Sequence, residues 1–135
     1  MKKHILLLDD DADEVDILLM AINDMTDKCT CTWVQYLDHA LKVIPHLQPD
    51  VILVDYNMPK TNGLLCIEQI NNLPVSHVHQ VVLYSTYIND EMKMQAKELG
   101  VCMCIKKPNT LNKLKEKLNY LIDYISTIEK ENMHK

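Results

Sequence analysis

The carboxylates of this sequence gather directly after short apolar runs. Asp9, Asp10 and Asp11 follow the run 5–8, and Asp55 follows the run 51–54. A short, continuous apolar run is typical of a strand that is buried on both faces. Because the carboxyl ends of parallel strands meet at one edge of a sheet, these carboxylates are expected to converge there.

Converging carboxylates repel one another, so the pattern favours a cation among them, and oxygen ligands suit Mg²⁺. Two further apolar runs also end in polar groups, with Ser85 after residues 81–84 and Lys107 after residues 101–105. A cation, an ammonium and a hydroxyl together can stabilise a phosphoryl group during transfer. Asp55 is the expected nucleophile, because it ends a central strand and lies between the other groups.

Five strands and five helices must position these residues. The expected strands cover residues 5–8, 30–36, 51–54, 80–84 and 101–105, and the expected helices cover about 13–25, 38–45, 64–73, 89–99 and 110–129. Such alternation requires crossover connections and a parallel sheet. The predicted fold is α/β: a doubly wound five-stranded parallel sheet of order 2-1-3-4-5, flavodoxin-like, with helices on both faces.

Composition excludes several classes of function. The chain has 135 residues, which is the size of one domain, and a net charge of −5. The first 105 residues contain no basic stripe, so nucleic-acid binding is not expected. The lysines of residues 106–117 are interpreted as a solvated helix face, with contact to an acidic partner as the weaker alternative. The first apolar run is too short for a signal peptide or a membrane span. Five cysteines are an odd count, and a domain of this size needs no disulfide framework, so a reduced, cytoplasmic protein is expected.

Taken together, these residues resemble the receiver domain of two-component response regulators. The matching positions are Asp9-Asp10, the segment Asp55-Tyr56-Asn57-Met58-Pro59 with Gly63, then Ser85, and finally Lys107-Pro108. The resemblance spans about residues 3–125 and is to single-domain, chemotaxis-regulator-like members. It implies a receiver domain over residues 1–128 and a frayed tail over 129–135.

The resemblance also implies a role for each residue. Asp55 would accept the phosphoryl group, Lys107 would pair with it before and after transfer, and Ser85 would bond a phosphoryl oxygen. The Mg²⁺ ligands would be Asp10, Asp55, the backbone carbonyl of Asn57 and, through water, Asp9. The donor would be a phosphohistidine on a sensor histidine kinase or a phosphotransfer protein. The chain would act without an output domain, either by binding an unknown downstream protein or by passing the phosphoryl group on, and would not be an enzyme beyond its own phosphorylation chemistry.

One position departs from the family pattern. The residue three before the lysine is usually aromatic and takes part in the output, and here it is Cys104. Tyr84 or Tyr87 could carry that role instead. The last helix also repeats apolar residues every seven positions, namely Leu111, Leu118 and Ile125 with Leu114, Leu121 and Ile128, which favours core packing first and a homodimer seam second.

Two other functions compete with this interpretation. In a small phosphatase of the haloacid-dehalogenase type, Asp9 would be the nucleophile and Asp11 the acid/base, but the segment that begins at Asp55 would then have no role. In a docking module, the site would act without phosphorylation. Retained Mg²⁺ binding and turnover of a small phosphomonoester distinguish the three.

Overall fold

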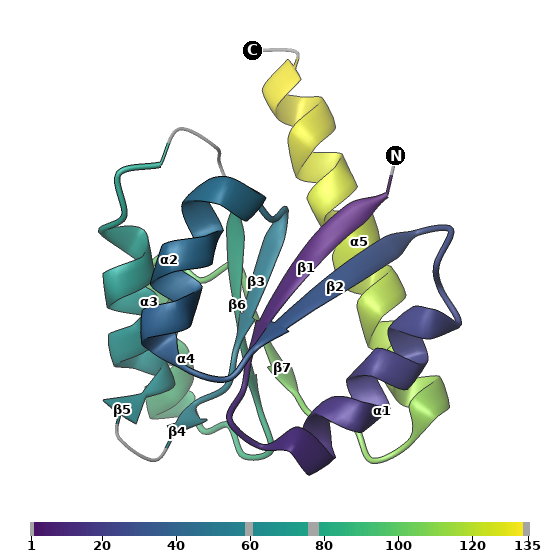
Figure 1. The fold of residues 1–135 in the computed structure, drawn as a ribbon, viewed down its shortest axis with the longest axis horizontal. Helices are drawn as coiled ribbons and strands as arrows, with labels where there is room; N and C mark the ends of the chain where they lie inside the picture. Colours follow the sequence, from purple (N-terminus) through teal and green to yellow (C-terminus); the bar gives the residue numbers. More distant parts are fainter. Residues whose placement is uncertain (1, 59–60, 76–78, 134–135) are drawn as a thin grey trace.

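The computed structural model describes residues 2–58, 61–75 and 79–133, with side chains up to residue 131. Five parallel strands form one sheet, and five helices cover it (Figure 1). The strands of the sheet are β1 (Lys3–Leu8), β2 (Cys29–Val34), β3 (Val51–Val54), β6 (Gln80–Ser85) and β7 (Met103–Lys106). The helices are α1 (Ala12–Asn23), α2 (Leu37–Leu47), α3 (Gly63–Asn71), α4 (Asp90–Glu98) and α5 (Leu111–Met133). Two short strands, β4 (Asn57–Met58) and β5 (Thr61–Asn62), pair antiparallel beside α3.

The order of the sheet is β2-β1-β3-β6-β7, which is 2-1-3-4-5 in chain order and confirms the predicted topology. The register places Leu8 opposite both Val34 and Val54, so the first three strands end level with one another. The backbone pairing continues one residue further, because the N–H of Asp55 donates to the carbonyl of Leu8 at 3.0 Å. Asp9 and Asp55 therefore leave the sheet side by side.

Apolar side chains cover both faces of the sheet. On β1, Ile5 and Leu7 pack with the helices α1 and α5, whereas Leu6 and Leu8 pack with α2, α3 and α4. Figure 1 shows these two helix layers on opposite sides of the sheet. Burial on both faces explains why the central strands have continuous apolar sequences, and it holds the carboxyl edge of the sheet in a fixed position.

The helix ends differ from the predicted ones by one or two residues, and by four at the end of the last helix. The predicted end of α2 near Pro45 is wrong, because the helix continues through this proline to Leu47. Proline removes one helical hydrogen bond, but here only the last turn is affected, and Gln48 then closes the helix with a left-handed φ of 49°.

The last helix is longer than the sequence predicted. It continues to Met133, past Glu129, so the boundary between domain and tail stays a prediction, and residues 134–135 lie outside the described residues. Four of its seven-spaced side chains, Leu114, Leu118, Leu121 and Ile125, are buried in the core of the monomer. The core-packing interpretation of the repeat is thus the stronger one. Among the described helices, none is long and apolar enough to cross a membrane.

Candidate functional site

Asp9 is held at the end of β1 by contacts to both of its carboxylate oxygens. Its Oδ1 accepts a hydrogen bond from the N–H of Asp11 at 2.9 Å, and its Oδ2 accepts one from Nζ of Lys107 at 2.8 Å. Its backbone carbonyl accepts the indole N–H of Trp33 at 2.7 Å. Asp9 is 1% exposed, so it is a fixed and fully engaged side chain at the end of β1.

Asp55 is buried as deeply but is much less engaged. It is 4% exposed, and its Oδ1 lies 3.4 Å from the backbone nitrogen of Asn57 and 3.6 Å from Nζ of Lys107. Both distances exceed those of a good charge-assisted hydrogen bond. The carboxylate of Asp55 thus keeps lone pairs available for a reaction.

The backbone of Asp55 is fixed by the close approach of α3. The N–H of Gly63 donates to the carbonyl of Tyr56 at 2.9 Å. A Cβ atom at position 63 would lie 2.6 Å from the backbone oxygen of Asp55 and 2.8 Å from Cα of Tyr56. Glycine is therefore required here, which explains why Gly63 follows the segment that begins at Asp55.

Lys107 brings one positive charge from the end of β7. Its N–H donates to the carbonyl of Ser85 at 2.8 Å, and its side chain is only 9% exposed. Besides Asp9 and Asp55, its Nζ forms an ion pair with Glu14. The ring of Tyr84 lies under the ammonium, with its centroid 5.2 Å from Nζ, which adds a cation–π contact.

The charges in the pocket do not balance. Burial raises the pKa of Asp55 to about 7, the ammonium of Lys107 opposes this shift, and the carboxylate of Asp9 adds to it. Burial lowers the pKa of Lys107, but its hydrogen bonds to Asp9 and Glu14 outweigh burial, and the pKa is raised. Three carboxylates thus share one ammonium, and this surplus of negative charge favours a further cation.

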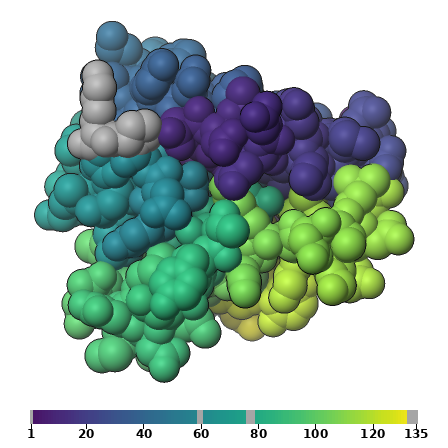
Figure 2. All heavy atoms as spheres, turned by 90° about the horizontal axis from the view of Figure 1, so that it is seen from below, coloured from purple at the N-terminus to yellow at the C-terminus, as the bar shows by residue number. Residues whose placement is uncertain are grey.

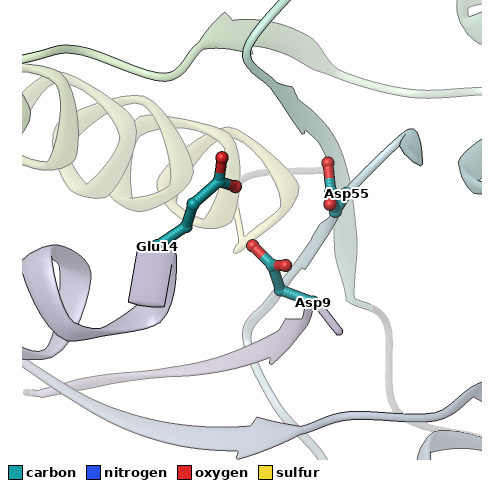
Figure 3. A group of neighbouring side chains, drawn as sticks. All are labelled: Asp9, Glu14 and Asp55. Atoms are coloured by element: carbon teal, nitrogen blue, oxygen red, sulfur yellow. The ribbon is translucent and has the colours of Figure 1, made fainter. Parts of the chain in front are cut away.

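A small pocket at the carboxyl edge of the sheet could hold this cation. It has a volume of about 170 Å³ and is lined by Asp10, Asp11, Glu14, Asp55, Asn57 and Thr86. Carboxylate oxygens of Asp9, Glu14 and Asp55 lie within 4.8 Å of one another, and Figure 3 shows the three side chains pointing into the same space. Oxygen ligands of this number and hardness fit Mg²⁺. The donor set therefore agrees with the cofactor that the sequence predicted.

Three of the predicted site residues lie at this pocket. Asp10 is half-buried on its rim, and Asp55 and Asn57 line it. Ser85 is fully buried at the end of β6, and its Oγ has no hydrogen-bond partner among the described residues. Figure 2 looks onto this edge of the molecule, where the segments that follow the strands meet. Pro59, which belongs to the predicted motif, lies outside the described residues.

Two contributors were missed in the sequence. The sequence prediction did not include Glu14 or Trp33 among the site residues. A signal for Glu14 was present: it lies four residues before the buried Leu18 and so shares the inward face of α1. For Trp33 no local signal exists, because its contact with Asp9 depends on the register of β1 and β2.

Comparison with known proteins assigns the family. A family model of the response regulator receiver domain matches residues 5–119. The chain therefore belongs to the response regulator receiver domains of two-component systems. Receiver domains bind Mg²⁺ at an acidic pocket, and in this chain Asp9, Glu14 and Asp55 lie close together.

Curated relatives carry this domain as one part of a longer chain. The sequence is 32% identical over 107 residues to protein-glutamate methylesterase/protein-glutamine glutaminase 1 of Caulobacter vibrioides, covering 79% of this chain and 31% of that protein. It is 34% identical over 61 residues to the transcriptional regulatory protein YdfI of Bacillus subtilis, covering 45% and 27%. The chain thus spans about a third or less of the length of these two relatives.

Solved structures share the fold. A CheY-like response regulator receiver domain protein from Methanospirillum hungatei superposes with a TM-score of 0.77 at 20% identity, covering 94% of this chain and 98% of that one. The response regulator domain of CheB from Thermotoga maritima gives 0.76 at 23% identity, covering 93% and 96%. At these identities the likeness establishes the fold, and the family rests on the sequence match.

Proposed function

We propose that the chain is a phosphorylation switch in which Asp55 accepts a phosphoryl group from a phosphohistidine in the presence of Mg²⁺. The observation that carries this proposal is the contrast between two buried carboxylates. Both oxygens of Asp9 are engaged at 2.9 Å or less, whereas the contacts of Asp55 are 3.4 Å and 3.6 Å. A nucleophile needs a free lone pair, so Asp55 fits the role and Asp9 does not. The same contrast argues against the phosphatase interpretation, in which Asp9 would attack.

Asp10, Asp55 and the backbone carbonyl of Asn57 would hold the Mg²⁺ directly, and Asp9 would contact it through water. Asp10, Asp55 and Asn57 line one pocket, which supports this assignment. The bound ion would neutralise the surplus carboxylate charge and the charge of the phosphoryl group. Asp9 would meanwhile keep its contact with Lys107, since its Oδ2 already faces the ammonium.

Lys107 and Ser85 would stabilise the product. Lys107 is the one buried ammonium described beside Asp55, and it could bond a phosphoryl oxygen after a small movement. The Oγ of Ser85 has no partner among the described residues, which makes it a donor that an incoming phosphoryl oxygen could satisfy. Both contacts would grow stronger as charge builds on the phosphoryl group.

The output would be a change at the surface near β6 and α4 that a partner protein reads. Cys104 lies half-buried against the core of α2, α3 and α4. Tyr84 is buried on the opposite face of the sheet, and Tyr87 is 64% exposed. Of these three, Cys104 lies nearest in sequence to Lys107, three residues before it on β7, so we assign it the relay position despite its small side chain. Receiver domains act with histidine kinases or phosphotransfer proteins, and we infer such a donor for this chain, which would itself catalyse no further reaction.

The test is phosphorylation by a small donor. The protein is incubated with acetyl phosphate, with and without Mg²⁺, and intact mass is recorded for wild type and Asp55→Asn. Asp16→Asn is the control. It also removes one carboxylate, but Asp16 is exposed on α1 and does not line the pocket. The expected result is one phosphoryl adduct that requires Mg²⁺, in wild type and in Asp16→Asn, and none in Asp55→Asn.

Two outcomes would contradict the proposal. An adduct that persists in Asp55→Asn would place the acceptor elsewhere. Wild type could also form no adduct at any time, early times included, and release no phosphate. The docking module would then be the remaining interpretation.

A further inference from the structure

Glu14 is a third carboxylate at the ammonium of Lys107. It lies in the first turn of α1, and its side chain is 38% exposed, whereas the neighbouring first-turn residue Asp13 is exposed to solvent. Acidic residues at this position usually stabilise the helix N-terminus. Glu14 instead points toward Asp9 and Asp55 (Figure 3). Its orientation calls for an explanation beyond helix stability.

The ammonium of Lys107 contacts Glu14 and Asp9 more closely than it contacts Asp55. An ammonium has three protons to donate. Lys107 donates at 2.8 Å to Asp9 and forms an ion pair with Oε2 of Glu14, while Oδ1 of Asp55 is 3.6 Å away. The lysine side chain is largely screened from water, so this difference in distance is a difference in interaction strength.

The other oxygen of the Glu14 carboxylate makes a longer and weaker contact. Its Oε1 lies 3.5 Å from Oγ1 of Thr86, which follows β6. The carboxylate of Glu14 thus contacts both Thr86 and Lys107, and Glu14 lines the same pocket as Asp55. An anionic phosphodonor that enters this pocket therefore meets the negative charge of Glu14.

We propose that Glu14 is a positioning residue that holds Lys107 away from Asp55 and restrains phosphorylation by small anionic donors. The proposal rests on the phosphorylation of Asp55 inferred above. In that reaction a P–O bond forms to Oδ of Asp55 while the bond between phosphorus and the acetate oxygen breaks, and acetate leaves with the electron pair. Lys107 assists when it turns to the phosphoryl oxygens. Glu14 opposes this turn and repels the donor.

The test compares Glu14→Gln with Asp13→Asn. Both variants remove one negative charge from the first turn of α1, but only Glu14 contacts Lys107. Rates of Asp55 phosphorylation are measured by intact mass in saturating Mg²⁺ with acetyl phosphate, a dianion, and with phosphoramidate, which carries less negative charge. The expected gain for Glu14→Gln is about threefold to tenfold with acetyl phosphate and smaller with phosphoramidate, as expected for repulsion between charges. Asp13→Asn is expected to stay within about twofold of wild type.

A readout independent of phosphorylation is the ¹⁵N–¹H signal of the Lys107 ammonium in Mg²⁺-free protein. A fixed ammonium exchanges its protons slowly, so the signal is expected in wild type and Asp13→Asn and should broaden in Glu14→Gln. Glu14→Asp keeps the charge on a shorter side chain. Its ammonium signal should be broader than that of wild type and narrower than that of Glu14→Gln. An unchanged ammonium signal in Glu14→Gln, or equal rate gains with both donors, would overturn the proposal. Failure of wild type to form any adduct would refute the proposed function instead, while the ammonium signal would still test the role of Glu14.

Discussion

Replacing Asp55 with Asn removes a buried carboxylate whose pKa is raised from 3.8 to about 7. Without Mg²⁺, the folded protein therefore keeps this proton at pH values where the unfolded chain has lost it. The stabilisation by the bound proton is fully present below pH 3.8 and is lost as pH rises through 7. Asn cannot titrate, so the free energy of unfolding of Asp55→Asn should lack this pH dependence.

The size of the effect follows from the two pKa values. Linkage predicts that wild type loses about 2 kcal/mol of unfolding free energy relative to Asp55→Asn between about pH 5.5 and about pH 8. Most of this loss occurs below pH 7, because above the folded-state pKa both states are ionised. The free energy of unfolding of Asp55→Asn should thus increase relative to that of wild type as the pH rises.

Urea unfolding in the presence of a chelator, followed by the fluorescence of Trp33, measures this gap at both pH values. The matched control is Asp16→Asn, an exposed carboxylate on α1, whose gap to wild type should change by less than about 0.5 kcal/mol. Adding Mg²⁺ at the higher pH should narrow the gap for Asp55→Asn, since the ion stabilises the ionised carboxylate. A gap that stays constant with pH would refute the reasoning, because Asp55 would then ionise as an ordinary carboxylate.

Two further substitutions test the supports of the site. Gly63→Ala should lower the free energy of unfolding by about 1–3 kcal/mol and slow phosphorylation of Asp55, because the added Cβ would lie 2.6 Å from the backbone oxygen of Asp55. Urea unfolding measures the first effect and intact mass the second. An unchanged free energy of unfolding would contradict the close approach of α3 to Asp55. Trp33→Phe should lower the free energy of unfolding by about 1 kcal/mol, because the hydrogen bond to the carbonyl of Asp9 is lost, and it should weaken Mg²⁺ binding. Calorimetric titration with Mg²⁺ measures the affinity. An unchanged affinity would show that Trp33 does not position Asp9.

Much of the site could be predicted because its residues follow strands that are easy to recognise. A run such as Val51–Val54 is buried on both faces and is therefore apolar throughout, so the first polar residue after it marks the edge of the sheet. Asp55 was found in this way, whereas Lys107 is the second polar residue after its run. Parallel topology then places such residues at one edge, whatever their separation in sequence.

Boundaries were harder to predict, because packing overrides local preference. Pro45 predicted the end of α2, yet the turn that follows it is stabilised by the packing of Ile44 in the core and closed by Gln48. A proline near a helix end removes a bond that the last turn can lose at low cost. Local sequence therefore indicated the helix but not its last residue.

The sequence by itself determined the alternation of strands and helices, the polar residues at the strand ends and the family to which they belong. Only the tertiary structure decided how the charges are shared. The ammonium of Lys107 could pair with any nearby carboxylate. The positions of α1 and of the segment after β7 at the carboxyl edge of the sheet place it closest to Asp9 and Glu14. Asp55 keeps the longer contact of 3.6 Å for the same reason. Electrostatic interactions fall off with distance and grow with burial, so the balance among these groups depends on positions that no local pattern of residues specifies.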